Sequence, residues 1–488
     1  MKNTHWIYQT GIASLALLAS PAMAANTPAT SAPTAPAAPS ASSAPAASKT
    51  ARPGDEITAA LPVIPDAKFN LKDFGGVGDY KTDNTGAFQK AIAAIKAAGG
   101  GHLIVPAGTY KTLPFTLTSK MDLHLEADAI IKAPDNFADY GLPDPVETPP
   151  GERYAGGRIN PLISGRDLTD VAITGNGTID GSGAEFWMWS DKAARRYPPG
   201  RAVVSRPHLI VLSNIQRLHI DGVTLTNSPM YHLVPSGSDL TIENIHVVAP
   251  STAPNTDAID PQGERIVIRK CTIDTGDDNV AVHCPSHDVL IENLTCLHGH
   301  GISIGSNTAR GLSHMIVRNC TFDGGDNGLR IKSFRSAGGE VHDITYSDLT
   351  MKNVRRPFDI NMLYHGNSPF ILPSGRSSDV GPRSPDGEAT NNIPNFHDIH
   401  ISNLTVTNSP LAGRIIGVPE QVPHNITFTN VKIQADRGFL VQDAKDIVFD
   451  NVKIDNTVGE TLVLDNATVK LNGTEKTGTS GGSTDPFY

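Results

Sequence analysis

The sequence has no excess of positive charge and few aromatic residues. Its 40 Lys and Arg residues are outnumbered by 50 Asp and Glu residues, which gives a formal net charge of −10, and aromatic residues make up only 6%. General binding of nucleic acid requires a basic surface, so the composition argues against a nucleic-acid partner. Any anionic ligand must therefore be held by local cations.

Long apolar runs are also lacking. The stretch from Ile12 to Leu18 is too short to span a bilayer, and no later segment is long enough, so we expect no membrane partner. Lys2 precedes this stretch and Ala22-Met23-Ala24 follows it, which is the pattern of a secretory signal peptide. We expect residues 1–24 to be removed, and the mature chain to be a soluble protein that is secreted, either to the extracellular space or to the periplasm.

Low-complexity segments flank the predicted folded part. Residues 25–65 are rich in Ala, Pro, Ser and Thr, a composition that cannot bury a core and predicts a flexible linker. Residues 473–488 are rich in Gly, Ser and Thr and predict a flexible C-terminal tail. The folded domain then spans residues 66–472, with no domain boundary inside it.

A short pattern of alternating apolar and polar residues recurs through this domain. Its anchors are spaced by 22 to 29 residues in the first part and lie at Ile220, Ile242, Ile268, Ile291, Val317, Tyr346, Ile401, Phe428 and Phe449. The runs are β-branched with period-2 alternation and show no long helical period. Because one repeat cannot bury its own apolar face, neighbouring repeats must stack. We predict an all-β, single-domain, right-handed parallel β-helix of about ten coils.

Two further features of the sequence support stacking. Thr85 to Ala98 has the pattern of a helix, which ends at Gly99-Gly100-Gly101 and is predicted to cap the N-terminal end of the stack. Asparagines that share one position in the repeat predict an internal asparagine turn ladder; they are Asn244, Asn293, Asn319, Asn403, Asn430 and Asn451. A Pro/Gly/Ser-rich excursion at residues 365–395 interrupts the repeat.

Cysteine is scarce: Cys271, Cys284, Cys296 and Cys320 are the only four. Export would permit disulfides. Cys271 and Cys320 share a repeat column two coils apart, which at normal strand spacing is roughly 9.6 Å and too far for a bridge. Other pairings and buried free thiols both stay open, and no cysteine–histidine spacing indicates zinc.

Acidic residues coincide when the repeats are aligned. One column, on consecutive coils, contains Asp257, Asp278, His300 and Asn327, and Asp277 directly precedes Asp278. Neighbouring strands lie roughly 4.8 Å apart, so three carboxylates and an imidazole share a small patch of the lateral surface. Arg330 and Lys332 come from the coil after His300, within reach of the same patch.

Clustered carboxylates have two chemical uses. Repulsion raises the pKa of at least one member, which provides the acid and the base that hydrolysis of a glycosidic bond requires. Calcium also binds clustered carboxylates, so on spacing alone a calcium site or a solvated acidic ladder stays open.

The motifs around this cluster resemble those of glycoside hydrolase family 28, the polygalacturonases. They are Asn255-Thr256-Asp257, Gly276-Asp277-Asp278, Gly299-His300-Gly301 and Arg330-Ile331-Lys332, in the order and near the spacing of the family. The resemblance extends over about residues 70 to 455. It implies an inverting hydrolase that cleaves α-1,4-linked galacturonan in pectin and uses no metal or organic cofactor. The expected partner is the polysaccharide, and the expected state is a monomer.

The resemblance also implies a role for each residue. Asp277 would protonate the leaving oxygen, Asp257 and Asp278 would activate the attacking water, and His300 would tune the acid. Arg330 and Lys332 would bind a galacturonate carboxylate, the first as a planar fork and the second as a point charge. Asn255 and Tyr364 are further candidates for contact with the substrate. The chain departs from the family at His283, where relatives often carry lysine.

Three alternatives have distinct signatures. A pectate lyase on the same fold would need calcium and would lack Gly299-His300-Gly301 in this register. A rhamnogalacturonan hydrolase of the same family would have less use for Arg330 and Lys332, which suit a carboxylate just past the cleavage point. A non-catalytic β-helix adhesin would gain nothing from stacked acids, since these hinder binding to a polyanion.

Overall fold

The computed structural model describes residues 56–145, 156–190, 204–364 and 392–479. Contacts divide the chain into two compact units, and all described residues lie in the second, Ala51–Tyr488. The predicted signal peptide, linker residues 25–55 and most of the excursion at 365–395 lie outside the described residues. Within the described ranges, no helix has the length and apolar character needed to cross a bilayer.

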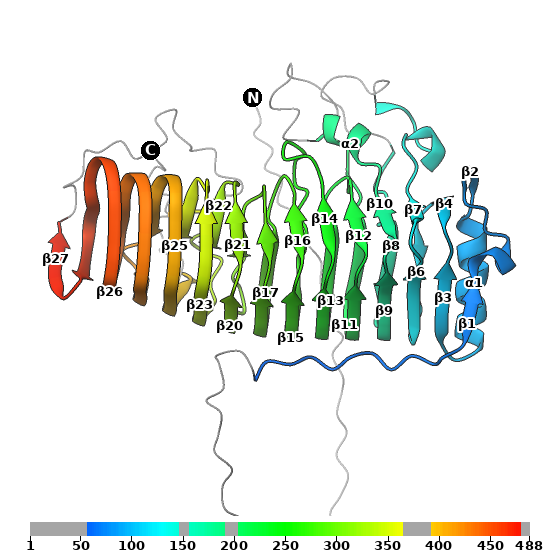
Figure 1. Cartoon of the computed structure of the whole chain (residues 1–488), viewed down its shortest axis with the longest axis horizontal. Coiled ribbons are helices and arrows are strands. Elements are labelled where there is room, and N and C mark those ends of the chain that lie inside the picture. The colour runs from blue at the N-terminus through cyan, green and yellow to red at the C-terminus, as the bar shows by residue number, and fades with distance from the viewer. Residues whose placement is uncertain (1–55, 146–155, 191–203, 365–391, 480–488) are drawn as a thin grey trace, which may run out of the picture. The chain divides into compact units, whose positions relative to one another are not determined.

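Short strands stack side by side along one axis, from β1 to β27 (Figure 1). Each coil pairs in parallel with the next, because the apolar alternation of neighbouring repeats is in register. The first ladder contains β1 (Lys68–Asn70), β3 (Gly101–Val105), β6 (Met121–Leu125), β9 (Thr169–Gly175), β15 (Gln262–Arg269) and β20 (Leu312–Arg318).

The second ladder follows the first within each coil. It contains β2 (Asp79–Asp83), β4 (Gly108–Lys111), β7 (Ala129–Lys132), β10 (Thr178–Asp180), β12 (Thr224–Thr226), β14 (His246–Val248), β16 (Thr272–Asp274), β18 (Thr295–Cys296) and β21 (Thr321–Asp323). The third ladder, which carries the candidate site, contains β5 (Phe115–Thr116), β8 (Ile163–Arg166), β19 (Ile302–Gly305), β22 (Asn327–Lys332) and β24 (Arg356–Asn361).

Longer strands bend from one ladder into the next. They are β11 (Ile210–Asp221), β13 (Leu233–Glu243), β17 (Val280–Glu292), β23 (Glu340–Lys352), β25 (Asn395–Ile416) and β26 (His424–Leu471). The parallel pairing of coil on coil is that of a parallel β-helix, so the predicted all-β class and the parallel β-helix are confirmed.

The predicted anchors form one buried column inside the stack. Register pairs Ile220 through Phe428 in sequence, and every anchor is at most 2% exposed. Burying such a side chain stabilises the fold by about 1.5–3 kcal/mol. Tyr346 pairs directly with Ile401, so the 55-residue gap in the repeat is a single coil with an excursion.

The N-terminal end of the stack carries α1 (Thr85–Ala97), close to the predicted bounds (Figure 1). Its buried face includes Phe88 and Ile95, and the Phe88 ring stacks on Phe115 at 4.6 Å. The other helices among the described residues are short: η1 (Leu71–Phe74), η2 (Ala138–Tyr140) and α2 (Ala184–Met188).

Described residues beyond both ends of the predicted domain also contact the stack. The predicted linker extends to residue 65, yet Ile57 packs against Val267, Leu290 and Ile316 on the outside of the stack, because this end of the linker contains apolar residues. At the other end, residues 474–478 of the predicted tail form β27 (Thr474–Gly478), which pairs antiparallel with the end of β26.

The asparagine ladder is present but is not internal, so that prediction was wrong in its burial. All six asparagines have φ between 50° and 57° and are exposed. A residue in this left-handed conformation turns the chain outward between the first and second ladders, and asparagine tolerates it better than most residues. Asn451 donates to Asn430 at 2.8 Å, and Asn430 donates to Asn403 at 3.2 Å. The four cysteines are free thiols, three of them buried.

Candidate active site

The stacked register brings the predicted residues together. Ile259 bridges to Val280, Val280 pairs with Ile302, and Ile302 pairs with Leu329. Two residues before each of these positions lie the members of the predicted column, which are Asp257, Asp278, His300 and Asn327. All of them therefore lie at the start of the third ladder, on four consecutive coils.

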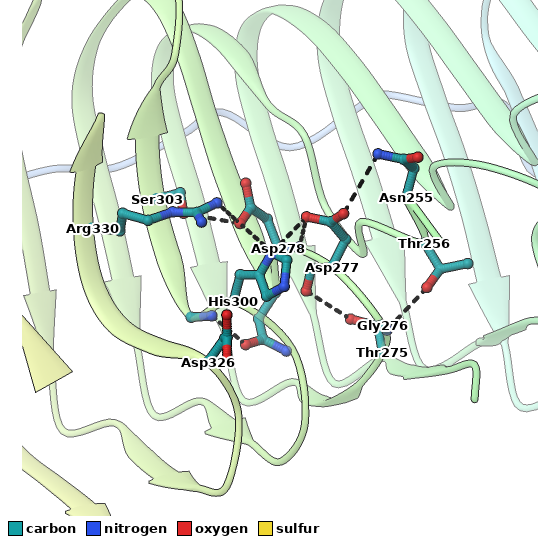
Figure 2. Close-up of polar contacts among 12 residues, drawn as sticks. Asn255, Thr256, Thr275, Gly276, Asp277, Asp278, His300, Ser303, Asp326 and Arg330 are labelled. Atoms are coloured by element: carbon teal, nitrogen blue, oxygen red, sulfur yellow. Dashed lines mark hydrogen bonds and ion pairs between the residues drawn. The ribbon is translucent and has the colours of Figure 1, made fainter. Parts of the chain in front are cut away.

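Asp278 is the most enclosed carboxylate of the cluster, with a side chain only 1% exposed. Lys332 Nζ donates to Oδ2 at 2.7 Å. Ser303 Oγ at 3.0 Å and the Arg330 guanidinium donate to Oδ1 (Figure 2). Burial alone would raise the pKa of Asp278, but the positive charges of Arg330 and Lys332 outweigh it and hold the pKa below its ordinary value. Asp278 is therefore a stable carboxylate.

Asp277 is more accessible and contacts the imidazole. Nδ1 of His300 lies 2.7 Å from Oδ1 of Asp277 and 3.8 Å from Oδ1 of Asp278 (Figure 2). Asn255 Nδ2 donates to Oδ2 of Asp277 at 3.5 Å, and Asn255 in turn accepts from Arg206 Nη2 at 2.9 Å. The position predicted to contact substrate, Asn255, thus also holds the side chain of Asp277.

Asp257 is buried without a counter-charge of its own. Burial, followed by the negative charges of Asp260, Asp277 and Asp278, raises its pKa well above the ordinary value. Its Oδ1 accepts no hydrogen bond from the described residues. The proton affinities of Asp257 and Asp278 are therefore driven apart, which is the separation that acid–base chemistry uses.

Threonine and glycine fix the loops that carry these acids. Gly276 N donates to Thr256 Oγ1 at 2.9 Å, which joins two of the predicted motifs. A Cβ on Gly276 would lie 2.1 Å from Ala253 O, and one on Gly301, at φ +70°, would lie 2.1 Å from Gly328 O. No larger residue fits at either place without moving the backbone.

Tyr364 also reaches the cluster. Its ring centroid lies 5.3 Å from Lys332 Nζ and 5.8 Å from Arg330 Cζ, within the range of a cation–π contact. The arrangement places all the predicted site residues near one another. Arg330 and Lys332, however, are 6% and 7% exposed and bind Asp278, so they are not simply exposed cations.

Sequence reasoning missed three residues of the site. Ser303 joins Arg330 to Asp278, since Arg330 Nε donates to its hydroxyl at 3.0 Å. Arg206 supports Asn255 from a coil nearer the N-terminus. Asp260 lies on the same coil as Asp257 and is 1% exposed. The register could have found Ser303 and Asp260, which share a column with Arg330, but no periodic signal identifies Arg206.

Two clusters among the described residues have ligand atoms within 4.8 Å of one another: Asp277, Asp278 and His300, and separately His219, Asp221 and Glu243. In the first, Arg330 and Lys332 already neutralise Asp278, so a divalent cation would be placed beside two buried positive charges. In the second, Glu243 is bound by Arg269 at 2.8 Å and by His219 at 2.9 Å. Neither set resembles the open, oxygen-rich shell that calcium prefers.

Comparison with known proteins places this geometry in a family. The model of Glycosyl hydrolases family 28 matches residues 102–380. A probable polygalacturonase of Vitis vinifera is 32% identical over 384 residues, which cover 75% of this chain and 74% of the relative. An endo-polygalacturonase of Pectobacterium carotovorum subsp. carotovorum is 29% identical over 417 residues, which cover 81% of this chain and 94% of the relative.

A solved structure is also similar. It is that of a hyperthermoactive exopolygalacturonase from Thermotoga maritima, with a TM-score of 0.68 and 27% identity, and the match covers 82% of this chain and 95% of that one. The predicted family and enzyme class are thereby confirmed. The chain belongs to glycosyl hydrolase family 28 and is a glycoside hydrolase.

Proposed function

We propose that the chain hydrolyses α-1,4 bonds between galacturonate units of pectin and polygalacturonate. The observation that carries this proposal is the pairing of a cation-bound Asp278 with the accessible Asp277 and the high-pKa Asp257 on consecutive coils. Relatives that are named polygalacturonases support the choice of substrate. Membership of a hydrolase family favours hydrolysis over calcium-dependent elimination.

Asp277 is the proposed general acid. Its side chain is 10% exposed, compared with 1% for Asp278, so it has better access to a glycosidic oxygen. His300, at 2.7 Å, tunes the affinity of Asp277 for the proton. Positioned proton transfer of this kind contributes about 10²–10⁴-fold to a rate.

Asp278 and Asp257 are the proposed activators of water. Asp278 is ionised because two cations hold its pKa low, and Asp257 offers an Oδ1 that accepts nothing from the described residues. The raised pKa of Asp257 means that it becomes a base only as the pH rises. The acid limb of the activity profile should therefore report Asp257.

Inversion of the anomeric centre is part of the proposal. The closest oxygens of Asp277 and Asp278 lie within 4.8 Å, and this spacing alone would suit a retaining pair at roughly 5–5.5 Å. A carboxylate whose two oxygens accept from Arg330, Lys332 and Ser303 is, however, a poor nucleophile. We therefore expect water to attack, and the first product to carry the β-anomer.

Substrate carboxylates are assigned to Arg330 and Lys332, with Tyr364 and Asn255 as neighbouring contacts. These cations would turn part of their hydrogen-bonding capacity from Asp278 to a galacturonate unit. No cofactor is needed for this chemistry. The proposal also includes secretion and a monomeric state. For the fold, it includes a right-handed β-helix of about ten coils and a capping role for α1.

The experiment uses the full chain with long polygalacturonate. Hydrolysis produces new reducing ends without ultraviolet-absorbing unsaturated products, and nuclear magnetic resonance of the first seconds should show the β-anomer. Appearance of unsaturated products would contradict hydrolysis, and an initial α-anomer would contradict inversion. Timed sizing of the products distinguishes endo from exo action, both of which occur among the similar proteins.

A further inference from the structure

His283 lies at the start of β17 and faces solvent beside the acidic cluster. Its side chain is 38% exposed, whereas that of its partner Asp260 is 1% exposed. Nε2 of His283 lies 3.3 Å from Oδ2 of Asp260. Among the described residues, no partner contacts the other ring nitrogen, Nδ1. A buried carboxylate thus holds one side of an imidazole whose other side is available.

The register aligns His283 with Lys332, one of the two cations already assigned to the substrate. Gln262 pairs with His283, and Gly305 pairs with Lys332. His283 and Gly305 directly follow the paired residues Val282 and Ile304, so they share the same column. His283 and Lys332 are therefore two coils apart, roughly 9.6 Å at normal strand spacing. Gly305 stands between them and has no side chain.

A polyanionic ligand would need more positive charge than Arg330 and Lys332 leave free. Arg330 and Lys332 are almost fully buried and bound to Asp278, so part of their charge is already neutralised. The ionisable groups around the Asp260–His283 pair include Asp278 and Asp257, which are negative, and Lys332, which opposes them. The imidazole, with a side chain 38% exposed, is more accessible to a passing chain than Lys332, with a side chain 9% exposed.

Protonation changes what His283 offers. When the ring is neutral and donates from Nε2 to Asp260, Nδ1 is an acceptor and repels a carboxylate oxygen. When the ring is protonated, both nitrogens donate, and Nδ1 gives a charge-assisted hydrogen bond to a carboxylate. An ordinary free imidazole is protonated at pH 5 and neutral at pH 8.

We propose that His283, held by Asp260, binds the carboxylate of a second galacturonate unit, next to the unit bound by Arg330 and Lys332. This inference rests on the proposed function, because it takes galacturonan as the ligand. It makes His283 a residue for substrate affinity and leaves the chemical step to the aspartates.

The test measures binding of a galacturonate oligomer by calorimetry in the Asp277→Asn background, so that the ligand stays intact. His283→Gln should weaken binding about tenfold at pH 5, the loss expected for one hydrogen bond to a charged group. The effect should disappear at pH 8. His283→Lys, which keeps its charge, should bind as tightly at pH 8 as at pH 5. His287→Gln, an exposed histidine of the same strand paired with Asp288, is the matched control.

Methyl-esterified oligomer provides the second arm. It lacks the carboxylate charge, so His283→Gln should bind it as the background protein does. Unchanged binding of the charged oligomer by His283→Gln at pH 5 would overturn the role of His283 while leaving the proposed function intact. Absence of binding to either oligomer by the background protein, together with a wild-type chain inactive on polygalacturonate, would overturn the proposed function itself.

Discussion

Nδ1 of His300 lies 2.7 Å from Oδ1 of Asp277, and the chain contains a close copy of this contact outside the site. In the copy, Nδ1 of His298 lies 2.8 Å from Oδ1 of Asp274. The copy is far more exposed, with side chains 57% and 32% accessible compared with 26% and 10%. Comparing variants of the two pairs therefore distinguishes the effect of the site on Asp277 from the effect that any Asp–His contact would have.

Asp277→Asn should lower kcat on polygalacturonate by about 10²–10⁴-fold, because an amide cannot donate the proton that the leaving oxygen needs. The fold should persist, since Asn keeps the shape of Asp. Initial rates and a circular dichroism spectrum check both statements. Asp274→Asn is the control and should keep full activity. A variant at position 277 with more than about a tenth of the activity would contradict the assignment of the acid.

Lys332→Ala should raise KM and also move the acid limb of the pH profile. Lys332 Nζ binds Oδ2 of Asp278, and its charge lowers the pKa of that carboxyl. Lys332 also lowers the pKa of Asp257, the residue to which the acid limb is assigned. Without the charge the pKa of both carboxyls rises, so the bases are ionised only at higher pH and the acid limb of kcat/KM shifts upward. Lys332→Arg should restore the limb in part. An unshifted limb together with an unchanged KM would show that Lys332 serves neither purpose.

Activity should survive chelation. Asp277, Asp278 and His300 have the ligand types of a cation site, but Arg330 and Lys332 supply the positive charge there. Rates on polygalacturonate before and after dialysis against a chelator test this point, with added calcium as the second arm. Loss of activity that calcium restores would favour a metal-dependent elimination.

The sequence predicts the architecture well because every coil of the stack carries the same apolar pattern. Ile242 and Ile268 occupy the same buried position on neighbouring coils. Once this register is known, the column through Asp257, Asp278 and His300 follows from it. Contacts that do not repeat are not predictable in this way. Nothing in the spacing of Arg206 indicates that it binds Asn255, 49 residues later.

Burial was also harder to predict than register. Asparagines such as Asn244 recur like core residues, yet the left-handed turn directs them outward. Lys332 has the sequence signature of a surface charge, yet it is 7% exposed because Asp278 compensates it. Alternation tells which residues share a column, but the turn geometry and the charge partners decide which of them are enclosed.

The fold should be stabilised at high pH by Asp260→Asn. Burial, opposed in part by the hydrogen bond with His283, raises the pKa of Asp260 to about 6. An aspartate in the unfolded chain titrates near 3.9, so the folded chain binds this proton more tightly. The favourable effect of protonation is complete below pH 3.9 and is lost as the pH rises through about 6. Above that, ionised Asp260 costs about 3 kcal/mol.

Asn at position 260 carries no charge and keeps an oxygen that can accept from His283. We therefore expect Asp260→Asn to unfold at a higher temperature than the wild type at pH 8, and at nearly the same temperature at pH 4. Thermal unfolding at the two pH values, with the partly exposed Asp274→Asn as the control, measures the difference. A variant less stable than the wild type at pH 8 would mean that ionised Asp260 contributes more through His283 than its burial costs. In that case Asp260 would stabilise the fold at pH 8, and its role would be structural rather than a loss of stability that accompanies function.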